Sequence, residues 1–296
     1  MIKSFFDKKN INYEENASLK KYNTYRLDTK CKYLVFPNSE EELIAILKEI
    51  KKDNLKYLIL GNGSNVIFSM DYYDGIIIKL DKLNSLTIND TTVSVGAGYS
   101  LIKLALETVD KGLEGLEFAA GIPGQVGAST AMNAGAYKSD MSEVVESVRF
   151  LNDKLEIIEF SNEDMAFEYR NSYLKQHPEY IVLSTTLKLK QGDTERLKEQ
   201  ITERRNKRLE TQPLDMPSAG SVFRNPEGMH AGELIEKSNL KGYNINGAEV
   251  SKKHANFIIN TGNATGKDII KLINIIKEKV NANFDVDLKL EQIIIE

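Results

Sequence analysis

Residues 119–137 read AAGIPGQVGASTAMNAGAY, a run of small residues around which the rest of the chain is interpreted. Glycines stand at positions 121, 124, 127 and 135. Glycine allows close backbone approach and positive φ, and the ring of Pro123 restricts one backbone angle. Such a segment either turns its backbone N–H groups toward a flat or anionic ligand or crosses another element closely. Spacing alone favours neither interpretation.

A second loop of the same kind lies earlier, in residues 56–65, which read KYLILGNGSN. The apolar run 57–60 followed by GNGSN predicts a strand that enters a tight turn. Successive N–H groups in such a turn form an anion-binding nest, and Ser64 and Asn65 add side-chain donors. A plain turn between strands is the alternative. Two small-residue loops in one chain favour a large phosphate-bearing cofactor without naming it.

Composition excludes several classes of protein. Of the 296 residues, 41% are hydrophobic and 28% charged, which is ordinary for a globular protein. The net charge of -4 predicts no attraction to nucleic acid or anionic lipid, so neither is an expected partner. Cys31 is the single cysteine, which excludes an internal disulfide. No apolar run approaches the ~20 residues of a membrane span. MIKSFFDKKN at the start lacks a signal-peptide core, and we expect a cytoplasmic monomer.

Hydrophobic periodicity predicts an α+β fold, because helices and strands are mixed without alternating as repeated βαβ units do. Predicted helices cover residues 39–52, 100–110, 193–209, 233–238 and 267–280. Predicted strands cover residues 57–60, 75–80, 91–95, 145–151, 155–160, 180–189, 256–260 and 288–295. Boundaries near 80 and 191 predict three parts, 1–80, 81–191 and 192–296. The last strand is able to return to the unit that the first two parts form.

Three common cofactor and metal motifs fail. A Rossmann fingerprint needs a third glycine where Val66 and Leu101 stand. No Walker A sequence follows either glycine loop. The histidines, His177, His230 and His254, are scattered, so we expect no metal site.

Six stretches, taken in order, resemble the UDP-N-acetylenolpyruvoylglucosamine reductase family. The resemblance runs from about residue 20 to the C-terminus, and the interval between the fourth and fifth stretches is similar to that of the shorter, type II form. The stretches are KYNTYR (21–26), LGNGSNVIF (60–68), AAGIPGQVGASTAMNAGAY (119–137), EYRNSYL (168–174), PSAGSVFRNP (217–226) and KKHANFIIN (252–260).

This resemblance implies a cofactor and a fold. The first two parts, 1–80 and 81–191, would hold FAD in the manner of the vanillyl-alcohol-oxidase-like (PCMH) flavoproteins, and a smaller α+β part, 192–296, would cover the substrate. The pyrophosphate loop would comprise Gly61, Asn62, Gly63, Ser64 and Asn65. The flavin and its ribityl chain would be lined by Ile122, Pro123, Gly124, Gly127, Ala128, Ser129, Asn133, Gly135 and Ala136.

The resemblance also implies a reaction, in which NADPH reduces the flavin and flavin N5 passes a hydride to the enolpyruvyl CH₂ carbon of a UDP-sugar. The product would be UDP-N-acetylmuramate, a peptidoglycan precursor. Arg170 and Glu291 would stabilise the enediolate charge, and Ser221 would supply a proton. From the residues alone, the alternatives are an ion pair for Arg170, a turn serine for Ser221 and a solvent-facing strand position for Glu291.

Further substrate contacts are implied at Tyr169, Arg224 and Asn225, with arginine at 224 where the family usually has lysine. Around Glu291 the pattern departs from the family: Lys289 replaces an acidic residue, and Gln292-Ile293 replace Val-Arg. Glu296 is therefore a rival for the glutamate.

Two other functions fit the same loops. One is an FAD-dependent oxidase or dehydrogenase acting on a small alcohol or hydroxy acid, which would need neither Arg170 nor Ser221. The other is a nucleotide-sugar or cofactor-binding module without turnover. Three reactive side chains in three separate motifs favour an enzyme, because such sites form where distant segments converge.

Overall fold

The computed structural model describes residues 2–296 and is an α+β chain that divides into two compact units. Unit 1 comprises Met1–Glu15, Tyr33–Gly61 and Asp74–Arg205, of which Met1 lies outside the described residues. Unit 2 comprises Asn16–Lys32, Asn62–Tyr73 and Asn206–Glu296. The chain therefore passes several times between the units. The predicted boundaries near 80 and 191 stay a prediction.

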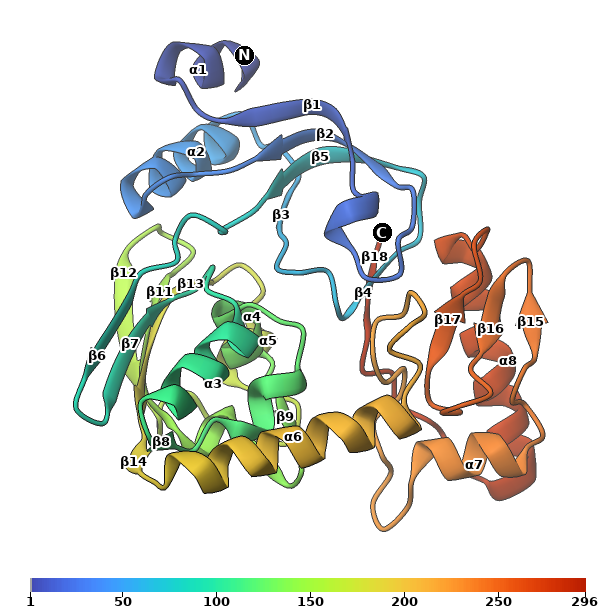
Figure 1. Ribbon diagram of the computed structural model, residues 1–296. Coiled ribbons are helices and arrows are strands. Elements are labelled where there is room, and N and C mark those ends of the chain that lie inside the picture. The colour runs from blue at the N-terminus through green and yellow to red at the C-terminus, as the bar shows by residue number, and fades with distance from the viewer. Residues whose placement is uncertain (1) are drawn as a thin grey trace. The chain divides into compact units, whose positions relative to one another are not determined.

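A five-stranded antiparallel sheet forms the centre of unit 1, in the order β12-β11-β13-β7-β6 (Figure 1). Its strands are β6 Leu86–Asn89, β7 Thr92–Gly96, β11 Val145–Leu151, β12 Ile157–Ser161 and β13 Ile181–Lys188. Helices α3 Leu101–Asp110 and α4 Val126–Ala131 lie over one face. The predicted hairpin of residues 145–160 and the long strand after it are confirmed.

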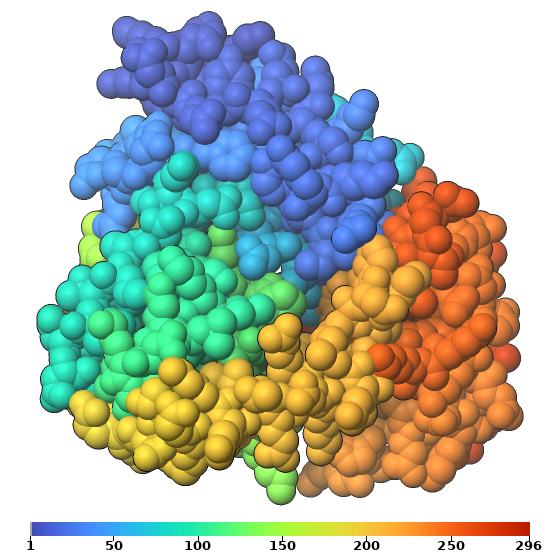
Figure 2. Space-filling view, viewed as in Figure 1, coloured from blue at the N-terminus to red at the C-terminus, as the bar shows by residue number. Residues whose placement is uncertain are grey.

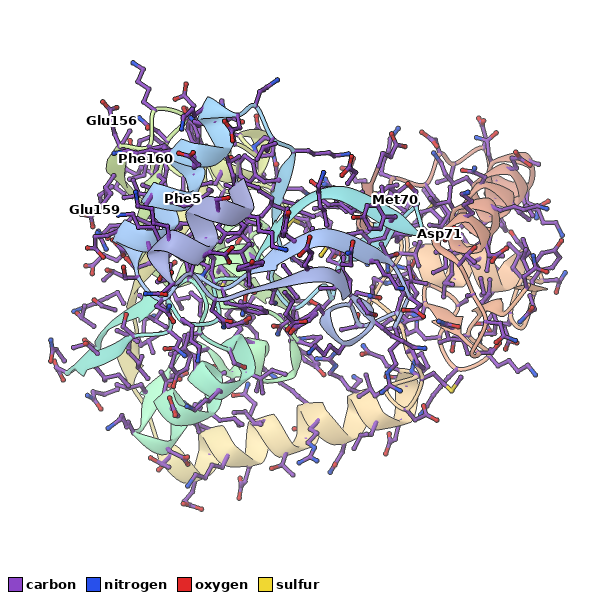
Figure 3. The ribbon with its side chains drawn as sticks, turned by 90° about the horizontal axis from the view of Figure 1, so that it is seen from above. Phe5, Met70, Asp71, Glu156, Glu159 and Phe160 are labelled. Atoms are coloured by element: carbon purple, nitrogen blue, oxygen red, sulfur yellow. The ribbon has the colours of Figure 1, made fainter. Side chains whose placement is uncertain are left out.

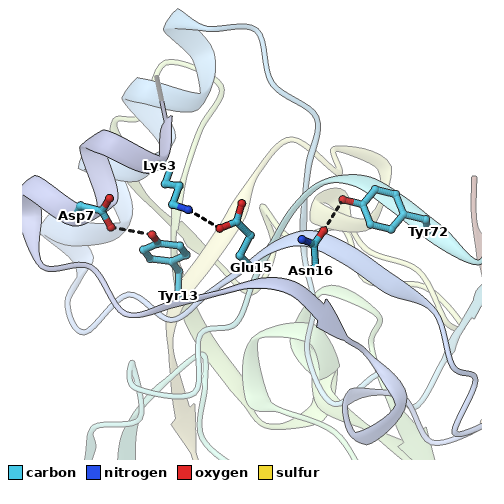
Figure 4. A network of polar contacts seen from close by, with 6 residues as sticks. All are labelled: Lys3, Asp7, Tyr13, Glu15, Asn16 and Tyr72. Carbon is cyan, nitrogen blue, oxygen red and sulfur yellow. Dashed lines mark hydrogen bonds and ion pairs between the residues drawn. The ribbon is translucent and has the colours of Figure 1, made fainter.

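A second sheet has the order β1-β2-β5-β3, with β1 Tyr13–Ser18, β2 Lys30–Val35, β5 Tyr72–Ile78 and β3 Tyr57–Ile59. Within unit 1 it is accompanied by α1 Ile2–Lys9 and α2 Glu40–Lys52. The N-terminal helix is joined to β1 by a Lys3–Glu15 ion pair of 2.6 Å and a Tyr13–Asp7 hydrogen bond of 2.7 Å (Figure 4). Figure 4 also shows Tyr72 donating to Asn16, a contact of unit 2.

Helix α2 illustrates how local signals set an element. Ser39 caps its first turn by accepting a hydrogen bond from the Glu42 amide at 3.2 Å. The apolar residues of its predicted inner face, at positions 43, 46, 47 and 50, are at most 1% exposed. They join a continuous hydrophobic core that extends to β13. Helix α6, Thr194–Thr211, behaves differently: its sole buried residue is Leu197, and it runs along the surface (Figure 2).

Unit 2 is built on helix α8, Gly266–Phe284, which begins with a capping box between Thr265 and Asp268. It packs with α7 Ala231–Lys237 and with the antiparallel sheet β15 Asn244–Ile245, β16 Ala248–Val250 and β17 Ile258–Asn260 (Figure 1). The turn before β5, whose residues Met70 and Asp71 are labelled in Figure 3, belongs to this unit. The carbonyls of Met70 and Asp71 accept hydrogen bonds from the Thr29 hydroxyl and the Lys30 amide.

The C-terminal strand differs from its prediction. Residues 288–295 were expected to form one strand, but β18 covers only Ile293–Ile295, where it pairs in parallel with β4 Val66–Phe68. Before it, Leu290 makes an isolated antiparallel bridge with Phe223. The predicted strand is divided because Leu290 pairs with Phe223 whereas residues 293–295 pair with β4. Similarly, the strand predicted from 256 begins at Ile258.

The remaining short elements connect these parts. They are η1 Lys20–Tyr22, β8 Leu113–Glu114, η2 Glu117–Gly121, β9 Gly135–Ala136, β10 Ser139–Asp140, η3 Met141–Glu143, α5 Tyr173–Gln176 and β14 Lys190–Gln191. Across residues 2–296, no helix combines the length and apolar content that a membrane crossing would require.

Candidate functional site

The glycine-rich stretch forms η2, helix α4 and β9 in unit 1, and several of its amides bond within the protein. The N–H of Gly124 donates to Ile122 O at 2.8 Å, and that of Gly127 to Ala97 O at 2.9 Å. A Cβ built on Gly127 would lie 2.7 Å from the Cβ of Ala97, which is closer than real Cβ contacts. At Gly127 the close-crossing interpretation therefore holds, and its amide is not one that faces a ligand.

The two glycine loops meet at one point. A Cβ on Gly61 would lie 3.3 Å from the Cβ of Ala128. Ala128 is exposed, although its α4 neighbours from Val126 to Thr130 are buried. The helix thus presents a single methyl outward beside the Gly61 backbone. A flat ring system could pass over such a surface, where the atoms within 4 Å of the Gly61 Cβ position are this methyl and Oε1 of Gln125.

A buried lysine supports this meeting point. Lys79 is 3% exposed, and its ammonium donates to the carbonyl of Gly61. It also lies 3.6 Å from Asp81, whose carboxylate accepts from Gln125 just before α4. Burial lowers the pKa of Lys79, and the charge of Asp81 opposes that shift. The network joins both loops, although Lys79 and Asp81 lie outside the stretches 60–68 and 119–137.

Arg170 is anchored to the same glycine-rich stretch. Its guanidinium donates to the carbonyl oxygens of Asn133, at 3.3 Å, and Gly135. The Asn133 carboxamide is 1% exposed and bonds Glu168 O at 2.9 Å and the Ser142 amide at 3.0 Å. Asn133, predicted as a cofactor contact, therefore ties the turn that carries Arg170 to residues 133–135.

Backbone conformation also orients this turn. Arg170 has φ 55°, an uncommon value for a residue with a Cβ, and its carbonyl accepts from Lys175 Nζ at 2.7 Å. Its guanidinium lies 5.0 Å from the ring centroid of Tyr169, a side chain that is 52% exposed. Two backbone carbonyls and the Tyr169 ring thus hold the guanidinium in place.

In unit 2, the rest of the first loop is bound to the protein. Gly63 has φ +62°, and a Cβ there would lie 2.2 Å from Tyr22 O, so this position requires glycine. Its carbonyl accepts from the Thr24 amide at 3.1 Å. Asn65 donates through Nδ2 to Glu291 O at 3.2 Å, and its own carbonyl accepts from the Ile293 amide.

Ser221 and Glu291 lie on neighbouring backbone segments of unit 2. The Glu291 amide donates to Val222 O at 2.8 Å, and the Arg224 amide to Lys289 O at 2.9 Å. On the other side, Ser221 makes an isolated antiparallel bridge with Phe257. Glu296, the rival glutamate, is exposed beyond the end of β18.

The other two predicted substrate contacts of unit 2 differ in their surroundings. Within the described residues, the buried Nε of Arg224 has no hydrogen-bond partner. A buried N–H without an acceptor is costly, which favours an anionic ligand at this side chain. Asn225 is exposed, and its Oδ1 accepts from the Ala231 amide at 3.1 Å, where α7 begins. The Asn225 Oδ1 is therefore already engaged in a hydrogen bond at the N-terminus of α7.

The structure thus distributes the predicted catalytic residues between units, Arg170 in unit 1 and Ser221 and Glu291 in unit 2. Sequence reasoning missed the carboxamides of Asn256 and Gln292, which bond the backbone on either side of Ser221. Asn256 stands in the stretch KKHANFIIN, and Gln292 is a departure from the family pattern.

In residues 2–296, no group of three or more metal-ligating side chains is present.

Comparison with known families defines the class of protein. The FAD binding domain family matches residues 31–161, a range that contains both glycine loops. The small-residue surface at Gly61 and Ala128 fits such a cofactor. The chain is an FAD-dependent oxidoreductase of the PCMH fold. The fold alone is shared with glucooligosaccharide oxidase from Acremonium strictum, which is 14% identical at a TM-score of 0.51, over 98% of this chain and 60% of that one.

The particular family follows from the remaining matches. Residues 212–295 match the UDP-N-acetylenolpyruvoylglucosamine reductase C-terminal domain. The reductase of Clostridium tetani is 41% identical over 96% of this chain and 92% of its own, and that of Bacillus subtilis 41% over 93% and 91%. The crystal structure of the Thermus caldophilus reductase is 32% identical at a TM-score of 0.82, covering 97% of this chain and 99% of that one. This chain belongs to the UDP-N-acetylenolpyruvoylglucosamine reductase family.

Proposed function

We propose that this flavoenzyme reduces UDP-N-acetylglucosamine enolpyruvate to UDP-N-acetylmuramate with NADPH, as a step in peptidoglycan precursor synthesis. Full-length similarity to reductases named for this substrate supports the proposal. The observation that carries it is the backbone pairing of unit 2, in which the Glu291 amide bonds Val222 O at 2.8 Å, next to Ser221. A hydroxyl and a carboxyl from distant segments therefore belong to one small region.

FAD, when bound, supplies the hydride chemistry, and the protein supplies binding, orientation and protons. Residues 61–65, together with Ala128 and its neighbours in 122–136, would hold the cofactor. Gly61 and Ala128 offer a surface of small residues beside the Gln125 carboxamide, and Lys79 keeps the Gly61 carbonyl in place.

Arg170 binds the substrate carboxylate in this proposal. Its planar fork matches a carboxylate, and its charge stabilises the negative charge that develops as the vinyl ether is reduced. The two carbonyl bonds from Asn133 and Gly135 fix the guanidinium before substrate arrives. Fixed donors lose less entropy when the transition state forms, so the orientation contributes to rate.

Ser221 donates the proton that completes the reduction, and Glu291 shares the charge of the substrate carboxylate. A serine hydroxyl is a weak acid, so it protonates only a strongly basic carbon held in the correct place. The exact placement of the Ser221 backbone therefore matters. Arg224 binds an anionic group of the substrate, because its buried Nε has no acceptor among the described residues.

Anaerobic half-reactions test the proposal. The purified protein should be yellow, NADPH should bleach it, and the enolpyruvyl sugar nucleotide should restore the colour. Ser221→Ala should leave bleaching by NADPH intact and slow recolouring by about 10²- to 10⁴-fold. Ser218→Ala, three residues earlier, is the control and should behave as the wild type. A wild-type protein that oxidises a small alcohol but ignores the sugar nucleotide would favour the oxidase alternative.

The cytoplasmic location, the monomeric state and the three-part boundaries stay predictions. Size-exclusion chromatography with light scattering tests the monomer directly.

A further inference from the structure

Two buried carboxamides hold the segment that carries Ser221, which we call the serine segment, residues 219–223. One belongs to Asn256, which is 4% exposed, and the other to Gln292, which is 3% exposed. Both lie in unit 2, as does the serine segment itself. Neither has a role in the function proposed above.

Asn256 replaces a strand partner on one side of the segment. Its Oδ1 accepts from the Phe223 amide at 3.0 Å, and its Nδ2 donates to Phe223 O at 2.8 Å. Its backbone carbonyl accepts from the Val222 amide at 2.9 Å. Asn256 thus makes three hydrogen bonds to the two residues after Ser221. Its carboxamide bonds both the N–H and the carbonyl of Phe223.

Gln292 holds the residues before Ser221. Its Nε2 donates to Ala219 O at 3.0 Å and lies 3.4 Å from Gly220 O. Its Oε1 accepts from the Tyr25 hydroxyl at 3.0 Å, and Tyr25 is fully buried. Burial raises the pKa of the Tyr25 phenol, so the group stays protonated and remains a donor. The Tyr25 bond orients the amide so that its NH₂ faces the serine segment.

The arrangement is specific because the partners Ala219, Val222, Phe223 and Tyr25 are buried and Gly220 is partly buried. Removing one side of a buried hydrogen bond leaves an unsatisfied group, and the backbone moves to relieve it. Gly220 has φ +73°, and no atom lies within 4 Å of where its Cβ would stand. That side of Gly220 is open, and the Gln292 bonds hold the carbonyls of Ala219 and Gly220.

We propose that Asn256 and Gln292 are positioning residues that hold Ser221 where its hydroxyl can protonate the substrate carbon. The inference rests on the proposed function and deepens it. The two side chains touch neither substrate nor cofactor in this scheme, and they act through the backbone of the serine segment. Tyr25 is the third member, because it orients Gln292.

The test compares four variants in the two half-reactions. Gln292→Met keeps the length of the side chain and removes its hydrogen bonds. Asn256→Asp keeps the acceptor for the Phe223 amide but places an oxygen against Phe223 O. Tyr25→Phe removes one hydroxyl. Ser238→Ala is the control, because this buried hydroxyl of unit 2 bonds Leu234 O and Asn283 and neither Tyr25 nor residues 219–223.

We expect Gln292→Met and Asn256→Asp to bind FAD and to be reduced by NADPH at the wild-type rate. Substrate-driven reoxidation should slow by about 10- to 100-fold, since a displaced reactive group loses rate without losing binding, and KM should stay unchanged. The solvent deuterium isotope effect on reoxidation should rise, because proton transfer becomes limiting. Tyr25→Phe should show a smaller slowing in the same direction.

Wild-type reoxidation rates and isotope effects in Gln292→Met and Asn256→Asp would overturn the inference, as would equal slowing in Ser238→Ala. If the first two variants fail to fold, the result rests on Tyr25→Phe, and an unchanged isotope effect there overturns it. Failure of the proposed function is distinct, because then the wild-type protein itself would not be reoxidised by the sugar nucleotide.

Discussion

Asn65 donates a hydrogen bond from Nδ2 to the backbone carbonyl of Glu291, with 3.2 Å between nitrogen and oxygen, across 226 positions of sequence. The Ile293 amide returns a bond to Asn65 O, and β18 then continues alongside β4. A side chain predicted to contact the cofactor thus anchors the residue proposed to stabilise the substrate carboxylate. The GNGSN loop, predicted to contact the cofactor, thus supports the C-terminal segment.

Asn65→Ala should therefore weaken two properties together. Loss of one hydrogen bond should lower the free energy of unfolding by about 1 kcal/mol, measured by urea denaturation. Reoxidation by substrate should slow more than reduction by NADPH, because the Glu291 backbone loses its tie. Asn246→Ala, which removes an asparagine bond to Asp268 elsewhere in unit 2, is the comparison and should leave the balance of the half-reactions as in the wild type. Equal slowing of both half-reactions would contradict the proposal that the Asn65 hydrogen bond positions Glu291.

Arg170→Lys tests whether the shape of the cation matters as well as its charge. Lysine keeps the charge but lacks the planar fork that pairs with a carboxylate and with the carbonyls of Asn133 and Gly135. We expect reoxidation by the enolpyruvyl substrate to fall by about 10²-fold or more, a range typical of lost transition-state donors. Reduction by NADPH should be retained. Full activity in the lysine variant would assign Arg170 a structural role instead.

Gly127→Ala tests the packing of α4. The new Cβ would lie 2.7 Å from the Cβ of Ala97 and 3.2 Å from its Cα, so the helix or the Ala97 backbone must shift. Such overpacking should cost about 1–3 kcal/mol in the free energy of unfolding. Ala128→Ser, at the exposed neighbouring position, should change stability little. A similar loss of unfolding free energy in Gly127→Ala and Ala128→Ser would show that the contact between Gly127 and Ala97 tolerates a side chain.

His254 predicts a pH dependence of stability. Burial lowers its pKa, Lys241 adds to the shift and Glu236 opposes it; the ring Nδ1 also accepts from the Asn256 amide at 3.3 Å. The unfolded chain therefore takes up the proton first as pH falls. As pH falls below about 6.5, the free energy of unfolding should decrease until the pH reaches the lower pKa of His254 in the folded state. Above about pH 6.5 the protonation of His254 should not affect the free energy of unfolding.

Urea denaturation across this range, on the wild type and His254→Asn, measures the effect. The asparagine retains an acceptor near the position of Nδ1 but does not titrate, so its profile should be flatter. Identical slopes for the two proteins would assign the dependence to other groups.

Local signals made several elements predictable. The Ser39 cap and the apolar face of residues 43, 46, 47 and 50 were readable because capping and periodicity depend on neighbours within a few positions. Loop residues 61–65 and 119–137 were likewise recognised by composition. The short extent of β18 was not predicted, since residues 288–292 pair with the Phe223 region rather than with β4. Strand length there depends on partners that no local pattern specifies.

By itself the sequence determined the α+β class, the main helices, the two glycine loops and the family resemblance, because these depend on residue types at short spacings. Only the tertiary structure decided which backbone amides are already used, that Gly61 lies against Ala128, and that Asn256 and Gln292 hold the segment of Ser221. Those relationships join residues far apart in the chain. Long-range hydrogen bonds form where folding brings their partners together, and the order of residues alone does not indicate which partners will meet.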